Sequence, residues 1–244
     1  MKRTPRVARA ARTDYRRPTV TAVAPLHADP AIDGAAVRAG LRRCRMTVER
    51  HAAYLTRLDA VLGDGDHGDN LVIGFRAVEA TLAGLPSETP PGELLRAVGH
   101  RLVAAVGGAS GPLYGTAFLE AGVVAGDRAE LDAQVVASML TAAADGLARR
   151  GRCAVGDKTI LDALRPAAAA FASEVHDPVM ASGATGQIAR AIGAAVRAAT
   201  RGMRSTRPLV ARRGLALRLG ERSAGHLDPG AVSCVLLLRA LGDD

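Results

Sequence analysis

The chain has 244 residues, of which 48% are hydrophobic but only 2% are aromatic, and it contains no Trp. A core of this size has to be packed largely by Ala, Leu and Val, which favours closely packed helices over sheets. The formal charge is +8, but residues 1–30 carry +5 of it, with seven Lys or Arg against two Asp, so the remainder carries only +3 and nucleic acid is not indicated as a partner.

The cysteines and the chain start exclude several further classes. Cys44, Cys153 and Cys234 lie far apart without CxxC spacing, which argues against a disulfide framework or a zinc site. No apolar run approaches the length of a membrane span and no signal-peptide pattern is present, so we expect a cytoplasmic protein without membrane contact. Residues 1–30 have the composition of an organellar transit peptide or, as we expect, of a disordered extension, and residues 31–244 are expected to form one domain.

From Asp33 onward, apolar residues recur at helical spacing in eight segments. Asp33 is the expected N-cap of the first segment, and Asp228 followed by Pro229 opens the last. Pro166 is tolerable only in the first turns of its helix or as a kink, and the basic, glycine-punctuated segment 204–226 shows no helical pattern. We therefore predict an all-α, antiparallel eight-helix domain with helices near 37–58, 71–82, 94–106, 112–124, 131–147, 159–171, 185–203 and 229–238.

Four glycine-rich polar loops, at 63–70, 107–111, 151–158 and 220–230, each lie next to the start of a predicted helix. In an up-and-down helical array, alternate connections lie at the same end, so these four loops should gather there. Helix N-termini present N–H groups without intrahelical partners, which favours binding of anions at that end.

The first of these loops is acidic and contains the sequence Asp64-Gly-Asp-His-Gly-Asp-Asn70. An extended backbone points Asp64 and Asp66 the same way, and Asp59 at the end of the preceding helix can close over the same spot. Without a nearby Lys or Arg, these carboxylates repel one another unless a cation lies between them. A solvated acidic loop is the alternative, but the pattern favours a Mg²⁺ site that holds phosphate.

Two familiar motifs are only approximated. Residues 151–159 resemble a Walker A loop, but Asp157 is inserted before Lys158 and no strand precedes the loop, so we reject a P-loop. The acidic loop resembles the start of an EF-hand, but no Glu stands at the twelfth position. His67 and His226 each lie in a glycine loop beside an Asp, and either a surface or a site role is open for them.

Taken together, the four loops resemble the L subunit (the DhaL-type nucleotide-binding domain) of dihydroxyacetone kinase. The matching segments are Asp59 to Asn70, Gly107-Gly-Ala-Ser-Gly-Pro-Leu-Tyr-Gly115, Gly156-Asp-Lys-Thr159 and Gly220 to Gly230. The resemblance implies an eight-helix antiparallel barrel with the nucleotide across one end, in agreement with the helix count.

The resemblance also implies a set of site residues. Asp59, Asp64 and Asp66 would be ligands to two Mg²⁺ ions that bridge the phosphates of ADP or ATP. Leu215 stands where the family has an arginine, and Arg213 or Arg218 is a candidate substitute. No catalytic residue is assigned, and the implied nucleotide-binding residues are His67, Gly68, Asp69, Asn70, Ala109, Ser110, Gly151, Ile160, Asp228, Pro229 and Gly230.

The implied function is that of a phosphotransfer subunit of a dihydroxyacetone (glycerone) kinase. It would pass phosphate from Mg-bound ADP or ATP to a small ketose held by a separate K subunit. A phosphohistidine carrier protein that rephosphorylates bound ADP, in a phosphoenolpyruvate-dependent system, and direct use of ATP are both open, as is a homodimer. The alternatives are a regulatory module that binds a transcription regulator or another partner without catalysis, and a purely structural helical protein.

Overall fold

The computed structural model describes residues 32–177 and 186–242. This part of the chain contains eight α-helices, one 3-10 helix and two strands of two residues each. The predicted extension at residues 1–30 lies outside the described residues. The helices are α1 Gly34–Leu62, α2 His67–Ala83, α3 Pro91–Ala105, α4 Ser110–Ala125, α5 Ala133–Gly151, α6 Leu161–His176, α8 Gln187–Ser205 and α9 Pro229–Leu241, with the 3-10 helix η1 Leu215–Ser223 and strands β1 Ile32–Asp33 and β2 Glu130–Leu131.

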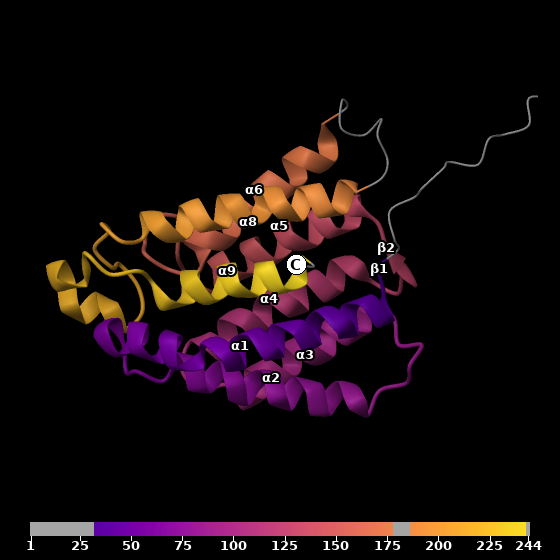
Figure 1. Cartoon of the computed structure of the whole chain (residues 1–244), viewed down its shortest axis with the longest axis horizontal. Coiled ribbons are helices and arrows are strands. Elements are labelled where there is room, and N and C mark those ends of the chain that lie inside the picture. The colour runs from indigo at the N-terminus through magenta and orange to yellow at the C-terminus, as the bar shows by residue number, and fades with distance from the viewer. Residues whose placement is uncertain (1–31, 178–185, 243–244) are drawn as a thin grey trace, which may run out of the picture.

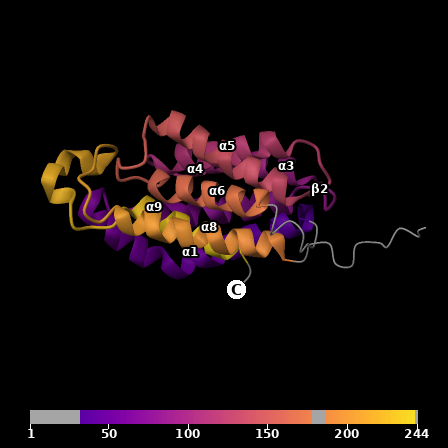
Figure 2. The ribbon, with the colours of Figure 1, turned by 90° about the horizontal axis from the view of Figure 1, so that it is seen from above.

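The α-helices form a closed ring around one main core, with a smaller apolar cluster of Leu95, Ala121, Ala125 and Leu131 beside it. Each helix packs against the next along the chain, and α9 returns to pack against α1. The helices run along the long axis of the molecule, side by side (Figures 1 and 2). Leu, Val and Ala fill most of the interior, together with Phe75 and Phe171. The predicted all-α, eight-helix antiparallel barrel is confirmed, and each predicted helix matches one of these eight to within a few residues at its ends.

Glycines allow α3 and α4 to pack with their backbones in close approach. A Cβ added at Gly99 of α3 would lie 2.8 Å from the carbonyl oxygen of Gly115 of α4. A Cβ at Gly92, two helical turns before Gly99, would overlap the carbonyl oxygen of Gly126 at the end of α4. Such contacts need residues without side chains. They explain how a chain with 2% aromatic residues still builds a tightly packed helical interior.

The end of the barrel at β1 and β2 is organised by helix caps. Asp33 accepts a hydrogen bond of 2.8 Å from the Ala36 N–H at the start of α1, and Asp132 accepts one of 2.8 Å from the Val135 N–H at the start of α5. β1 pairs antiparallel with β2, with Ile32 opposite Leu131. The Asp33 cap was predicted, whereas the two-residue strands are too short to give a sequence signal.

One detail differs from the sequence prediction. Within the segment 204–226, residues 215–223 form η1, which the glycine-punctuated pattern did not indicate. Gly220 interrupts η1 with φ 53°, which explains why no continuous helical periodicity is visible. Pro166 is the sixth residue of α6 and lies in its second turn, within the first turns where the sequence analysis allowed a proline. None of the helices in the described ranges is long and apolar enough to cross a membrane.

Candidate metal and nucleotide site

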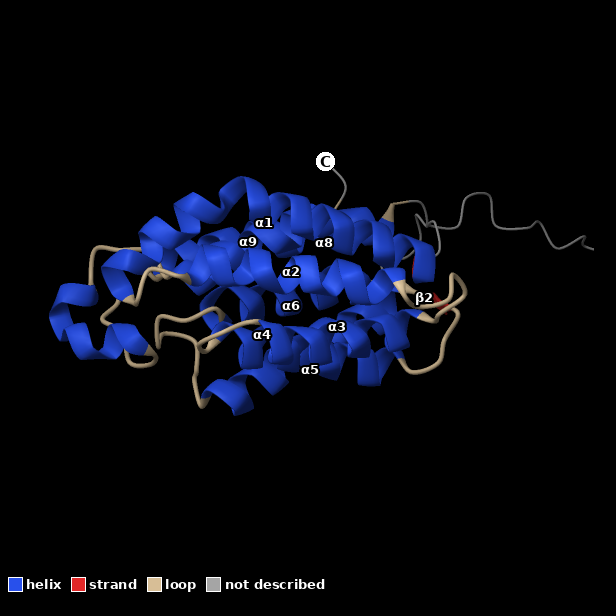
Figure 3. Ribbon diagram, turned by 90° about the horizontal axis from the view of Figure 1, so that it is seen from below, coloured by secondary structure: helices blue, strands red, loops and turns tan. Residues whose placement is uncertain are grey.

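The four glycine-rich loops lie at one end of the barrel, as predicted. Figure 1 shows this end on the left, where α1, α3, α5 and α8 end and α2, α4, α6 and α9 begin, with η1 beyond them. Figure 3 shows the loops of this end opposite the end that carries β2. All the site residues predicted from the resemblance lie in these connections or in the adjoining helix turns.

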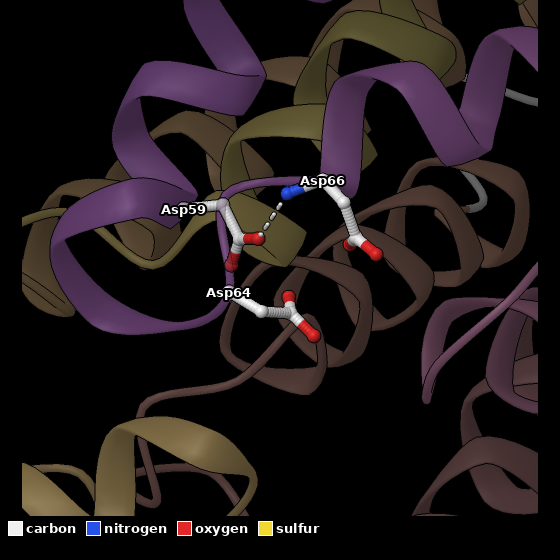
Figure 4. A group of neighbouring side chains, drawn as sticks. All are labelled: Asp59, Asp64 and Asp66. Atoms are coloured by element: carbon white, nitrogen blue, oxygen red, sulfur yellow. Dashed lines mark hydrogen bonds between the residues drawn. The ribbon is translucent and has the colours of Figure 1, made fainter.

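Three carboxylates converge in the acidic loop between α1 and α2. One oxygen from each of Asp59, Asp64 and Asp66 lies within 4.8 Å of the others (Figure 4). Asp59 is buried in the last turn of α1, at 9% exposure, whereas Asp64 and Asp66 are exposed to solvent. The group is therefore anchored in the protein on one side and open on the other.

Asp59 also organises the loop itself. Its Oδ2 accepts backbone N–H groups from Gly65 at 2.9 Å, Asp66 at 3.0 Å and His67 at 3.3 Å. Gly65 has φ +76°, a conformation that glycine adopts without strain, and it turns the chain so that these three N–H groups face one carboxylate. The chain between Asp59 and His67 therefore forms a compact turn closed by these hydrogen bonds.

No counter-charge neutralises this group within the described residues. None of the ion pairs found there includes Asp59, Asp64 or Asp66. Partial desolvation of its carboxyl group raises the pKa of Asp66, and the neighbouring Asp64 and Asp59 carboxylates raise this pKa further, against a hydrogen bond from the Asn70 side chain that lowers it. Oxygen ligands with surplus negative charge are the donor set that Mg²⁺ prefers, so the residues present fit such an ion.

The start of α2 packs tightly on α1 beside the acidic loop. A Cβ added at Gly68 would overlap the carbonyl oxygen of Ala52, so this position excludes any larger residue without a shift of the helices. Asp69 is exposed in the first turn of α2, where its charge suits the helix dipole. Asn70 lies next to the glycine loop, since a Cβ added at Gly107 would be 3.4 Å from its Oδ1.

His67 does not point to solvent. Its ring is buried, with Nδ1 2.9 Å from Ser110 Oγ at the start of α4 and Nε2 2.9 Å from Ser233 Oγ in α9. The Tyr114 hydroxyl lies 2.7 Å from the same Ser233 oxygen. Burial lowers the pKa of His67, while the Asp59 carboxylate opposes this shift.

Lys158, in the loop before α6, is turned inward rather than toward a ligand. It is 2% exposed, and its Nζ donates to the carbonyl oxygens of Thr206 at 2.6 Å and of His226. These two residues flank the segment 207–225, so Lys158 holds both ends of the excursion that carries η1. Burial lowers the pKa of Lys158, whereas Asp228 and Asp162 raise it.

The same loop is braced by carboxylates. Asp162 accepts the backbone N–H groups of Gly156 at 2.6 Å and Thr159 at 2.7 Å. Asp228 caps α9 by accepting the Ala231 N–H at 2.7 Å, and burial raises the pKa of Asp228 to about 7. Ile160 lies against the start of α9, because a Cβ added at Gly230 would be 3.3 Å from the Ile160 Cβ.

Leu215, which the resemblance predicts to replace an arginine, lies at the start of η1. Leu215 is 41% exposed there. Arg213 is engaged elsewhere, since its Nε donates to the Arg152 carbonyl oxygen at 2.6 Å and lies 3.5 Å from Asp157 Oδ2. Arg218 is exposed on η1. Of the two candidate substitutes, Arg213 therefore has a structural role in bracing the loop after α5.

Several residues of this end were missed by sequence reasoning. Tyr114 lies in a segment that carries the resemblance but was given no role, and Ser233 is an ordinary helical position; only the buried contacts of Ser233 with His67 and Tyr114 reveal their role. Asp162 falls in the first turn of α6, where an acidic residue is common and gives no specific signal.

A closed ring of antiparallel helices, with an uncompensated acidic loop among helix N-termini at one end, defines an α-helical barrel protein suited to a divalent cation and an anionic ligand. Residues 61–243 match the model of the DAK2 domain family. The chain therefore belongs to this family, and the predicted resemblance is confirmed.

Two similar proteins have names that describe an ADP-binding subunit. The chain is 39% identical over 197 residues to the ADP-binding subunit DhaL of PEP-dependent dihydroxyacetone kinase 2 from Listeria innocua, covering 80% of this chain and 87% of that one. It is 36% identical over 201 residues to the ADP-binding subunit DhaL of the PEP-dependent dihydroxyacetone kinase of Escherichia coli, covering 82% and 92%.

The fold is similar to that of a larger kinase. The crystal structure of the dihydroxyacetone kinase from C. freundii in complex with AMP-PNP and Mg²⁺ matches with a TM-score of 0.63 and 25% identity. The match covers 95% of this chain but 38% of that one, so the chain corresponds to one part of the larger protein.

Proposed function

We propose that this protein is the nucleotide-binding phosphotransfer subunit of a dihydroxyacetone (glycerone) kinase. The observation that carries the proposal is the convergence of Asp59, Asp64 and Asp66 within 4.8 Å, without a cationic partner in the described residues, at the end of the barrel where helix N-termini meet. The relatives named above are ADP-binding kinase subunits, which supports phosphotransfer over a purely regulatory or structural role.

Asp59, Asp64 and Asp66 would hold Mg²⁺, which supplies neutralisation of phosphate charge during transfer of a phosphoryl group. The three N–H groups donated to Asp59 keep its carboxylate in place before any ion binds. Asp64 and Asp66 are exposed and complete the ligand set from the solvent side. Two Mg²⁺ ions per nucleotide are part of the proposal.

The nucleotide would lie across the end of the barrel. Its phosphates would meet the starts of α2 and α4, with the backbone N–H groups of Gly68 and Asp69 and the hydroxyl of Ser110 among the contacts, because helix N-termini favour anions. Ile160 and Gly230 pack against each other on the neighbouring side and would border the rest of the nucleotide, with Gly151 at the end of α5. Arg218 on the exposed η1 is the remaining candidate for the missing family arginine.

The phosphoryl acceptor would be a small ketose on a separate K subunit. The exposed position of Asp64 and Asp66 supports transfer to a group held by another protein. The two relatives are named as subunits of PEP-dependent kinases, which supports a phosphohistidine carrier as the phosphate source. Cytoplasmic localisation, with every component of this system in one compartment, is part of the same proposal.

Calorimetric titration of the full chain with ADP in the presence and absence of Mg²⁺ tests the nucleotide step. We expect binding only with Mg²⁺, loss of that binding in Asp64→Ala, and near-normal binding in the neighbouring control Asp69→Ala. Equilibrium dialysis with Mn²⁺ then counts the ions bound per ADP. The absence of Mg·ADP binding by the wild-type chain would refute the proposal.

Reconstitution tests the phosphotransfer step. The chain is mixed with a K subunit and dihydroxyacetone, and the phosphate donor is either ATP or a phosphoenolpyruvate-driven carrier system. Formation of dihydroxyacetone phosphate with the carrier system alone identifies the donor as phosphohistidine, whereas formation with ATP alone identifies exchangeable nucleotide. No product with either donor would contradict the kinase function while leaving nucleotide binding intact.

A further inference from the structure

His67 connects the acidic loop, the start of α4 and helix α9. Its backbone N–H lies 3.3 Å from Asp59 Oδ2 in the acidic loop. Its ring contacts Ser110 at the start of α4 and Ser233 in α9, each at 2.9 Å. His67 is 7% exposed and Ser233 is fully buried, so water does not compete for the contact between these two side chains. The partners are 43 and 166 residues away in sequence.

The hydrogen positions in this network follow from counting donors. Ser233 Oγ lies 3.0 Å from the carbonyl oxygen of Gly230, which can only accept, so the Ser233 hydroxyl donates to it. A serine has one hydroxyl proton, so Ser233 must accept from the Tyr114 hydroxyl and from His67 Nε2–H. In the neutral ring Nδ1 is then an acceptor, and Ser110 donates its proton to it.

This assignment satisfies every group in the network and fixes one tautomer. His67 carries its proton on Nε2, and the Ser110 hydroxyl is directed at Nδ1. The oxygen of Ser110 is thereby held in one orientation at the N-terminus of α4, instead of rotating freely. The same ring connects α4 to the first residue of α2, whose N–H is bound by Asp59.

From this geometry we propose that His67 is a positioning residue that couples the cation-binding acidic loop to the glycine loop at the start of α4. The inference rests on the proposed function. Asp59, Asp64 and Asp66 would hold an ion on the turn that ends at His67, and the Asp59 hydrogen bond to the His67 N–H ties the ring to that turn. Because the His67 ring is hydrogen-bonded to Ser110, it also fixes the position of the Ser110 side chain. The acidic loop and the start of α4, which would meet the nucleotide phosphates, are therefore ordered before the nucleotide binds. Prearrangement lowers the entropy lost on binding.

Two substitutions separate the two ring contacts. The terminal amide of Gln reaches to about the Nε2 position, so His67→Gln keeps the Ser233 contact and loses the Ser110 contact. The shorter Asn reaches to about the Nδ1 position, so His67→Asn keeps Ser110 and loses Ser233. His51→Gln is the matched control, because His51 lies on α1 with its Nδ1 bonded to the Thr47 carbonyl oxygen, outside the candidate site.

Calorimetry of the full chain with Mg²⁺ alone and with ADP at saturating Mg²⁺ gives the test. We expect His67→Gln to bind ADP about tenfold more weakly, the equivalent of one hydrogen bond, while its affinity for Mg²⁺ changes less than twofold. Ser110→Ala should show the same loss, and the double variant His67→Gln/Ser110→Ala should lose little more. The control His51→Gln should retain the wild-type ADP affinity, and His67→Asn, which keeps the Ser110 contact, should lose less ADP affinity than His67→Gln.

A spectroscopic readout is independent of nucleotide. In ¹⁵N NMR of the ligand-free wild-type protein, the His67 ring should show the protonated Nε2 and acceptor Nδ1 pattern, and Ser110→Ala should shift the Nδ1 resonance alone. The opposite tautomer would overturn the assignment on which the coupling depends.

Two binding results would overturn the coupling. One is a folded His67→Gln that binds ADP as the wild type does, and the other is a parallel loss of Mg²⁺ and ADP affinity with a lowered melting temperature, which marks a purely structural role. If wild-type protein fails to bind Mg·ADP, the proposed function fails first and the coupling falls with it.

Discussion

The three carboxylates of the acidic loop should differ in what they contribute to the ligand-free fold. Asp59 accepts three backbone N–H groups, at 2.9, 3.0 and 3.3 Å, whereas Asp64 and Asp66 are exposed. A hydrogen bond to a charged group contributes about 1.5–3 kcal/mol net, and the third contact is long enough to contribute less. Asp59→Ala should therefore lower the free energy of unfolding by about 3–6 kcal/mol, a large share of the roughly 5–15 kcal/mol typical of a domain.

Urea unfolding followed by circular dichroism at 222 nm, in buffer with EDTA, measures this difference. Asp64→Ala and Asp66→Ala are the matched controls, and they should unfold at the wild-type midpoint or slightly above it, because each removes repulsion within the group. Asp59→Asn, which keeps one oxygen acceptor, should fall between. All three alanine variants should lose Mg²⁺-dependent ADP binding. Equal midpoints for Asp59→Ala and Asp64→Ala would refute the assignment of an organising role to Asp59.

Three further changes test other parts of this end of the barrel. Gly68→Ala should destabilise the protein by about 1–3 kcal/mol in the same unfolding assay, because the new Cβ overlaps the backbone of α1, and Gly84→Ala, whose Cβ has no neighbour closer than 3.6 Å, is the control. Lys158→Met leaves the carbonyl oxygens of Thr206 and His226 without their donor, so backbone hydrogen exchange in residues 207–225 should become faster while that of α3 stays unchanged. If residues 207–225 exchange at the same rate in the variant and the wild type, Lys158 does not hold this segment in place. The pKa of Asp228 is raised to about 7 from an ordinary 3.8, so between these pH values the folded state binds a proton that the unfolded chain releases. The contribution of Asp228 to stability should therefore fall between pH 4 and pH 7, by at most about 1.4 kcal/mol per pH unit. The melting temperature of Asp228→Asn should depend less on pH over this range than that of the wild type, and an equal dependence would contradict the shift.

The helices and the acidic group were accessible from sequence because local signals encode them. Apolar spacing marks each amphipathic helix over several turns, and short side chains such as Asp33 and Asp228 cap helices within three residues. Asp64 and Asp66 are two residues apart and Asp59 is only five further away, so the turn brings them together without help from distant segments. Once the helices alternate in direction, the grouping of the four loops follows.

Side-chain direction across long sequence distances was decided only by the tertiary structure. In the sequence, Lys158 stands in a loop that resembles a phosphate-binding one, yet packing turns it toward the carbonyl oxygens of Thr206 and His226. His67 sits in the most recognisable stretch of the chain, but its ring partners come from α4 and α9. Local periodicity carries no information about such contacts, because they arise only when the barrel closes and buried polar groups must find partners. The composition of the acidic site is thus a local property of the sequence, and the way it is joined to the rest of the nucleotide site is a property of the closed fold.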